Sequence, residues 1–177
     1  MPFWIQTGNP SVVPSPTISP ESDLAETVQA VFPMETEDAV IVWNHIRVPL
    51  SYKYDVSVVM EDVVGLSEFL LGSSKSTRVS FGSDTFQAIW RIERLDRHIR
   101  VDSEWASVAG DIENVLNERR SLEIPTADFL AEWNELTRKV LECCSLAGVQ
   151  VVGSAALERL QGIAKAIPCR GRLYRAK

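Results

Sequence analysis

The stretch TRVSFGSDTFQAIWRIERLDRHIRVDSEW, residues 77–105, decides the fold class of this chain. Two runs within it alternate between inward and polar positions with a period of two, which is typical of half-buried strands. The inward positions are Phe86, Ala88, Trp90 and Ile92 in the first run, and Ile99, Val101, Ser103 and Trp105 in the second. A short polar break around Leu95 and Asp96 separates the two runs. The pattern therefore predicts an antiparallel hairpin with one buried face.

A third strand is predicted just before this hairpin. Val79 and Phe81 alternate with polar neighbours, and residues 82–84 have the composition of a turn. The opposite face of the sheet is then densely charged, with Arg78, Arg91, Glu93, Arg100, Asp102 and Glu104 on it. One interpretation is a solvated face with cross-strand ion pairs, each contributing about 0.2–1 kcal/mol. The other is a recognition surface, since the rigid fork of arginine is favoured at interfaces.

Helical periodicity predicts four helices outside this stretch. The first begins with Ser19 as its cap and Pro20 at its first position, and ends at Pro33. The second is capped by Asp55 and runs through Leu71. The third is capped by Thr126 and stops at Gly148, and the last covers residues 155–167. Four of the five tryptophans fall on inward faces of predicted elements. Trp4 is the exception, and is either a lid on the core or an anchor for a partner.

Two further strands are predicted over residues 39–43 and 46–54, joined by a turn at Asn44 and His45. Pro49 has no N–H to donate, so the second of these strands should lie at a sheet edge or be bulged at Pro49. Between Trp105 and Ser121 a short helix is possible, and residues 122–124 allow a strand.

This order of elements predicts an α+β fold, with a mainly antiparallel sheet and helices packed on one face. We expect a single domain over residues 1–177, with a proline-rich irregular segment at 1–18 and a basic tail at 168–177.

Charge is distributed unevenly along a chain whose formal net charge is -6. Residues 1–46 contain six carboxylates and no lysine or arginine, whereas every charged residue after Glu158 is basic. Net acidity argues against nucleic acid, because binding to it depends on neutralised phosphates. No apolar run approaches the ~20 residues of a membrane helix, and no basic region precedes an apolar core at the start. The three cysteines, Cys143, Cys144 and Cys169, are no disulfide framework, so we expect a cytoplasmic protein.

No catalytic, metal or nucleotide motif is visible in the sequence. His45 and His98 stand outside any zinc pattern, and Cys143-Cys144 lack the CxxC spacing. Cys169 lies in a basic stretch that favours the thiolate, but has no evident histidine partner. Residues 148–153, GVQVVG, lack the lysine that a phosphate-binding loop requires. We therefore expect neither an enzyme nor a bound cofactor.

Three stretches give the chain a resemblance to immunity proteins of bacterial toxin–immunity systems, including contact-dependent inhibition. They are LSYKYDV at 50–56, WRIERLDRHIRVDSEW at 90–105 and FLAEW at 129–133. The resemblance implies a small acidic α+β protein that binds one cognate toxin domain and blocks its active site. It carries over no individual functional residue.

The charge distribution suggests where a basic partner would bind. The candidate partner-binding residues are Glu35, Glu37, Asp38, Glu61 and Asp62, since complementary charge speeds encounter. The alternative is a small-ligand protein or enzyme with a site on the polar sheet face, built from Arg91, His98, Arg100 and Asp102. A third possibility, an adaptor or structural subunit, predicts a large exposed apolar patch.

Overall fold

The computed structural model describes residues 2–19, 21–151 and 153–168. Over these residues the chain has an α+β fold with antiparallel strands, as the sequence predicts. Pro20, Cys169 and the rest of the predicted basic tail after Pro168 lie outside the described residues.

The strands form two antiparallel sheets rather than the single sheet expected. The three-stranded sheet contains β1 (Phe3–Gln6), β2 (Ala39–Trp43) and β3 (Ile46–Leu50), and the four-stranded sheet contains β4 (Ser76–Gly82), β5 (Phe86–Leu95), β6 (His98–Val108) and β7 (Ser121–Pro125), each in that order. The helices are α1 (Leu24–Val31), α2 (Ser57–Leu71), α3 (Glu113–Glu118), α4 (Thr126–Leu146) and α5 (Ala155–Ala166), and a π-helical turn, η1 (Tyr52–Val56), leads into α2.

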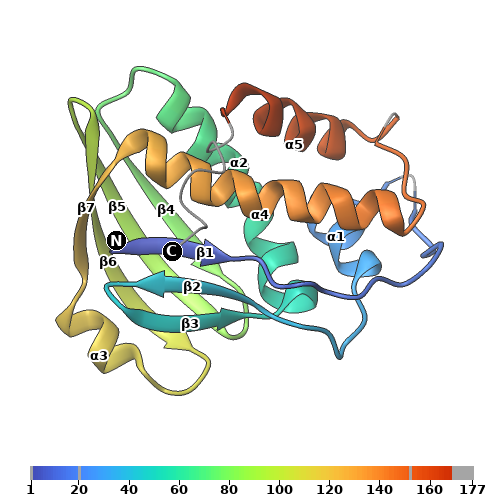
Figure 1. Ribbon diagram of the computed structural model, residues 1–177, viewed down its shortest axis with the longest axis horizontal. Helices are drawn as coiled ribbons and strands as arrows, with labels where there is room; N and C mark the ends of the chain where they lie inside the picture. Colours follow the sequence, from blue (N-terminus) through green and yellow to red (C-terminus); the bar gives the residue numbers. More distant parts are fainter. Residues whose placement is uncertain (1, 20, 152, 169–177) are drawn as a thin grey trace, which may run out of the picture.

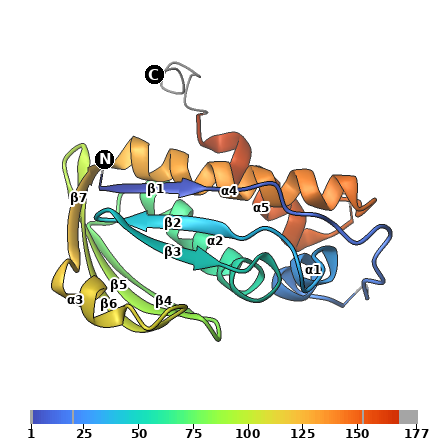
Figure 2. The same ribbon diagram turned by 60° about the horizontal axis from the view of Figure 1, so that its bottom comes forward.

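The four-stranded sheet confirms the predicted hairpin and its alternation. Trp90 pairs with Ser103 and Ile92 with Val101, and all four side chains are buried. Both features allowed after Trp105 are present, the short helix as α3 and the strand as β7. In Figures 1 and 2, α1, α2, α4 and α5 lie on one side of this sheet, together with the three-stranded sheet. Apart from α3 at its margin, the charged face of β4–β7 is left uncovered by helices.

The three-stranded sheet corrects one expectation and confirms another. The predicted irregular segment 1–18 contains strand β1, whose Phe3 and Ile5 are buried and whose partly exposed Trp4 lies opposite Val42 on the outer face. The prolines flank this strand without interrupting its alternation, so its ladder can form. Strand β3, which contains Pro49, lies at a sheet edge as predicted.

The turn between β2 and β3 falls at the predicted position. Asn44 and His45 both have positive φ, 47° and 71°, as a two-residue hairpin loop of the I′ type requires.

Three predicted helix caps are wrong. Helix α1 is capped by Asp23 instead of Ser19, because the Asp23 carboxylate accepts from the Glu26 N–H at 2.8 Å in a capping box. The helical chain before α2 begins with η1, which is capped by Ser51. Asp55 lies inside η1 and is not its cap. Thr126 is the first residue of α4, and within the described chain its buried hydroxyl has no hydrogen-bond partner.

An aromatic cluster joins the two sheets and α4. The ring centroids of Trp43 and Trp90 are 5.0 Å apart, and those of Trp43 and Trp105 are 5.4 Å apart. Phe3 of β1 contacts Trp43 of β2 and Phe129 of α4, and its ring centroid lies 6.2 and 4.7 Å from theirs. The predicted burial of the four tryptophans other than Trp4 is confirmed, and this rigid core supports both outer surfaces described below.

Candidate binding surfaces

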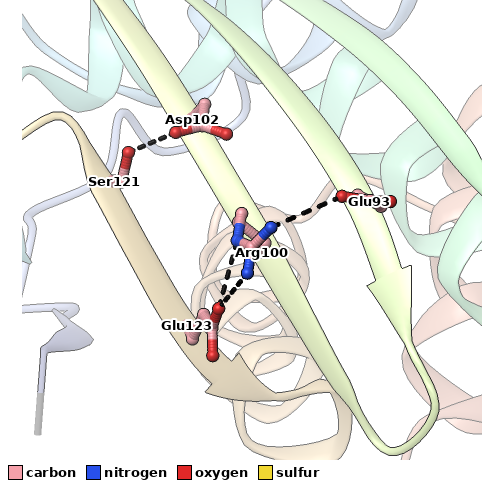
Figure 3. Close-up of polar contacts among 5 residues, drawn as sticks. All are labelled: Glu93, Arg100, Asp102, Ser121 and Glu123. Atoms are coloured by element: carbon pink, nitrogen blue, oxygen red, sulfur yellow. Dashed lines mark hydrogen bonds and ion pairs between the residues drawn. The ribbon is translucent and has the colours of Figure 1, made fainter.

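The uncovered face of β4–β7, here called the sheet face, carries charges that pair with one another. Figure 3 shows Arg100 between Glu93 and Glu123, with its guanidinium 3.8 Å and 2.6 Å from the two carboxylates. The hydrogen bonds that Arg100 donates to the Glu123 carboxylate are the main reason why the pKa of Arg100 is raised. Beside this group the Asp102 carboxylate accepts from the Ser121 hydroxyl. The predicted cross-strand ion pairs are therefore present on three adjacent strands.

One part of the sheet face departs from this pairing. Arg91 contacts Glu104 at 3.1 Å, but Arg78 stands directly opposite Arg91 and has no ion pair with any described residue. Arg91 and Asp102 are among the residues that line a surface hollow of about 690 Å³, whereas Arg100 and His98 are not. The residues of the alternative ligand site thus share one sheet face without converging on one hollow.

The predicted acidic residues occupy two different environments. Glu35, Glu37 and Asp38 are exposed in the connection from α1 to β2. The Glu37 carboxylate accepts from the Asn9 N–H at 3.0 Å, and no ion pair reaches any of these three carboxylates from the described residues. Burial, and then the charge of Asp55, raises the pKa of Asp38. This group is therefore an uncompensated concentration of negative charge.

Met34 lies beside these carboxylates and is 73% exposed, the largest exposure among the large apolar side chains of the described chain. The backbone of its connection is held in place where the Ser11 N–H donates to the Thr36 hydroxyl at 2.7 Å. Met34 was not among the predicted site residues. The available signal was a methionine between Pro33 and Glu35, in a segment too short and too acidic to be buried.

The start of α2 lies next to this connection, which runs past it in Figures 1 and 2. The Lys53 ammonium donates to the carbonyls of Gln29 and Phe32 at 3.2 and 3.0 Å, and so binds the end of α1 instead of a carboxylate. Tyr54 and Val58, one helical turn apart, are each 38% exposed. We call Met34, Glu35, Glu37, Asp38, Tyr54 and Val58 together the acidic surface.

Glu61 and Asp62 lie further along α2 and differ from the acidic surface. Arg159 of α5 bridges Glu61 and Glu68, contacting the Glu68 carboxylate at 2.8 Å. The hydrogen bond from Arg159 lowers the pKa of Glu68. Burial raises the pKa of Asp62, and the charge of Glu61 adds to this effect. Of the five predicted residues, Glu61 is thus already neutralised within the chain.

The thiols of α4 are poorly suited to nucleophilic chemistry. Cys143 and Cys144 are buried, and this burial raises their pKa values to about 11 and about 12. Among the described residues no cluster of three or more histidine, cysteine or carboxylate side chains has a metal-binding arrangement. In the same part of the chain no helix combines the length and apolarity that a bilayer crossing demands.

Comparison with protein-family models, with curated proteins and with solved structures found no match for this chain. What the two surfaces do therefore has to be argued from their own chemistry.

Proposed function

We propose that this chain is a non-catalytic immunity protein, which binds and neutralises a cognate toxin domain in the bacterial cytoplasm through the acidic surface. The observation that carries the proposal is the exposure of Met34 among carboxylates that no described cation neutralises. An exposed apolar side chain within a field of one charge combines the two usual components of a protein interface. The apolar group supplies buried area at the centre, and the charges steer the encounter.

The chemistry of the acidic surface defines the partner. A toxin domain with a basic rim around its active site would be attracted to Glu35, Glu37 and Asp38. Met34 is unbranched and adapts its shape to an irregular apolar hollow, and Tyr54 adds a rigid amphipathic ring. Neutralisation then needs only occlusion of the toxin's active site, so the immunity protein itself performs no chemical step.

The sheet face supports this function less well. Its carboxylates already have cationic or hydroxyl partners within the chain, as the contacts of Arg91, Arg100 and Ser121 show. A partner would have to break these contacts before it could form its own, which reduces the net gain on binding.

A charge-reversal pair tests the proposal. The chain serves as bait in a lysate of the cells that produce it, and the captured protein is purified for titration. The variant E35K/E37K changes the net charge by the same amount as the matched control E118K/E135K, whose carboxylates are also exposed and without ion pairs to described residues. We expect E35K/E37K to weaken binding at least tenfold and to reduce its salt dependence, and the control to bind like the native chain.

Neutralisation is measured in the same experiment. The captured domain should be toxic when expressed alone and harmless when it is coexpressed with the native chain. Equal binding by E35K/E37K and E118K/E135K would exclude the acidic surface, and a captured protein whose activity is unaffected would exclude the immunity function.

A further inference from the structure

A second surface hollow, of about 710 Å³, lies between the N-terminal segment and the start of α5. Its volume falls within the range of about 300–1,000 Å³ that is usual for small-molecule sites. One wall comes from residues 15–19 and 22–27, which lead into α1, and the other comes from the loop between α4 and α5 and the start of α5. The loop is the GVQVVG stretch, in which Gly148 and Gly153 have positive φ values of 83° and 92°. These glycines allow the chain to leave α4 and to enter α5 through tight bends.

The described lining of this hollow combines apolar residues with uncharged polar ones. None of its described lining residues is charged, although charged residues make up 24% of the whole chain. Hydrogen-bonding side chains come from both walls: Ser15, Ser19, Ser22, Thr27, Gln150 and Ser154. The hollow on the sheet face, by contrast, is lined by arginines and carboxylates.

Thr27 is the most deeply buried polar residue of the described lining. It is only 2% exposed, and no hydrogen bond joins its hydroxyl to a described residue. Its oxygen is not among the fully buried atoms without a partner, so it remains open to a molecule in the hollow. Thr137 shows the ordinary arrangement: it is equally buried on α4 and donates to the Trp133 carbonyl at 3.0 Å.

The start of α5 does not supply an anion site. The Gly153 N–H donates to the Glu158 carboxylate at 3.0 Å, and the Leu157 N–H donates to the Ser154 hydroxyl at 3.4 Å. A carboxylate therefore already occupies the positive end of the helix, and the described lining residues offer no cation to a phosphate. Neutral donors and acceptors on both walls instead match a ligand that bears hydroxyl groups itself.

We infer that this hollow binds a small neutral molecule with several hydroxyl groups, of the sugar or polyol class, and that Thr27 is one of its hydrogen-bonding residues. The inference is independent of the proposed toxin-binding function, because the hollow and the acidic surface share no residue. A ligand there would contact both the N-terminal segment and α5, and would stabilise their packing by binding only the folded chain.

Amide NMR spectra of the full chain test the inference. Glucose, trehalose and myo-inositol serve as neutral probes, and orthophosphate serves as the charged comparison. We expect at least one neutral probe to shift the amide signals of residues 15–27 and 148–157 in a saturable way, and orthophosphate to leave them unchanged. The variant T27V should weaken that binding about fivefold, the usual effect of one lost hydrogen bond.

Matched variants separate binding from folding. T137V makes the same chemical change at an equally buried site outside the hollow, and should bind the probe like the native chain. S22A removes a second lining hydroxyl and replaces T27V if that variant fails to fold. The inference is overturned if no neutral probe shifts these signals, if orthophosphate alone does so, or if T27V, or S22A in its place, binds as tightly as T137V.

Discussion

The sheet face and the acidic surface both carry carboxylates, but only on the sheet face do these carboxylates have cationic partners among the described residues. On the sheet face, strand register places Arg100 between Glu93 and Glu123, and places Asp102 beside Ser121. On the acidic surface no described cation reaches Glu35, Glu37 or Asp38, and Lys53 binds carbonyls instead. The charges of a paired network stabilise the sheet without any partner, because each group offsets the charge of its neighbours. Unpaired like charges repel one another and destabilise the folded chain slightly, so an external partner is the simpler explanation for them.

The largest effect should come from the buried carboxylate beneath the acidic surface. Asp55 accepts from the hydroxyls of Ser83 and Thr85 and from the Ser51 N–H, at distances of 2.5 to 2.9 Å. D55A removes all of these hydrogen bonds at a carboxylate that is only 1% exposed, so we expect it to lower the free energy of unfolding by about 3 kcal/mol. Urea denaturation measures the change. The control D84A removes an exposed carboxylate that lies between Ser83 and Thr85 in the chain. It should change the free energy of unfolding by less than about 0.5 kcal/mol. Similar losses for both variants would show that the carboxylate network is not what holds this region together.

A smaller effect should follow from removing the one lysine beside the acidic surface. K53M keeps most of the aliphatic chain but loses the two hydrogen bonds to the end of α1, and should cost about 1 kcal/mol. The control K75M removes an exposed ammonium that makes no hydrogen bond to a described residue, and should be nearly neutral. If K53M instead stabilised the chain, then Lys53 would be better described as an unfavourable buried charge than as a helix cap.

Much of the fold was predictable because local chemistry determined it. The alternation around Trp90 and Trp105 was strong enough to define the strands, and Pro49 identified an edge. The split into two sheets was not predictable, since it depends on which strands meet in space. Strand β1 was missed because prolines surround a run of only four residues. The helix caps failed where two polar residues competed, as Ser19 and Asp23 do before α1.

Only the amino-acid composition of the candidate sites could be predicted from the sequence, and not their contacts. The sequence showed that the first 46 residues lack basic side chains, which predicted an acidic region. It did not show that Arg159, 98 residues away from Glu61, would neutralise that carboxylate. Thr27 was hidden for the same reason, because the loop before α5 that completes its hollow follows more than a hundred residues later. Contacts between distant segments decide which charges stay free, and one sequence does not contain them explicitly.

Removing one charge from each surface should change the melting temperature in opposite directions or by different amounts. R100A breaks contacts with both Glu93 and Glu123, so we expect its melting temperature to fall by about 1–2 °C at low salt. E35A relieves repulsion without breaking an ion pair to a described residue, and should leave the melting temperature unchanged or slightly higher. Adding salt should shrink the R100A effect by screening. E93A, which loses only the 3.8 Å contact, is the control and should have less effect than R100A.

The smallest effects should appear in the pH dependence of stability, where a paired and an unpaired carboxylate have opposite signs. Burial raises the folded-state pKa of Asp38, so its ionised form opposes folding, whereas Arg159 lowers the pKa of Glu68, whose ionised form favours folding. At pH 7 we therefore expect D38N to be slightly more stable than the native chain and E68Q slightly less stable, each by at most about 0.5 kcal/mol because both side chains are exposed.

The two differences should disappear in different pH ranges. The gain from D38N should be lost first, as the pH falls from the raised pKa of Asp38 to below the ordinary aspartate value of about 3.9, because the carboxyl is then protonated in both states. The loss from E68Q should persist to lower pH and vanish only as the pH falls through the lowered pKa of Glu68. Urea denaturation of the three proteins across this range measures both. Changes of the same sign would mean that the pairing of these carboxylates does not decide their contribution, and the distinction between the two kinds of surface would lose its physical basis.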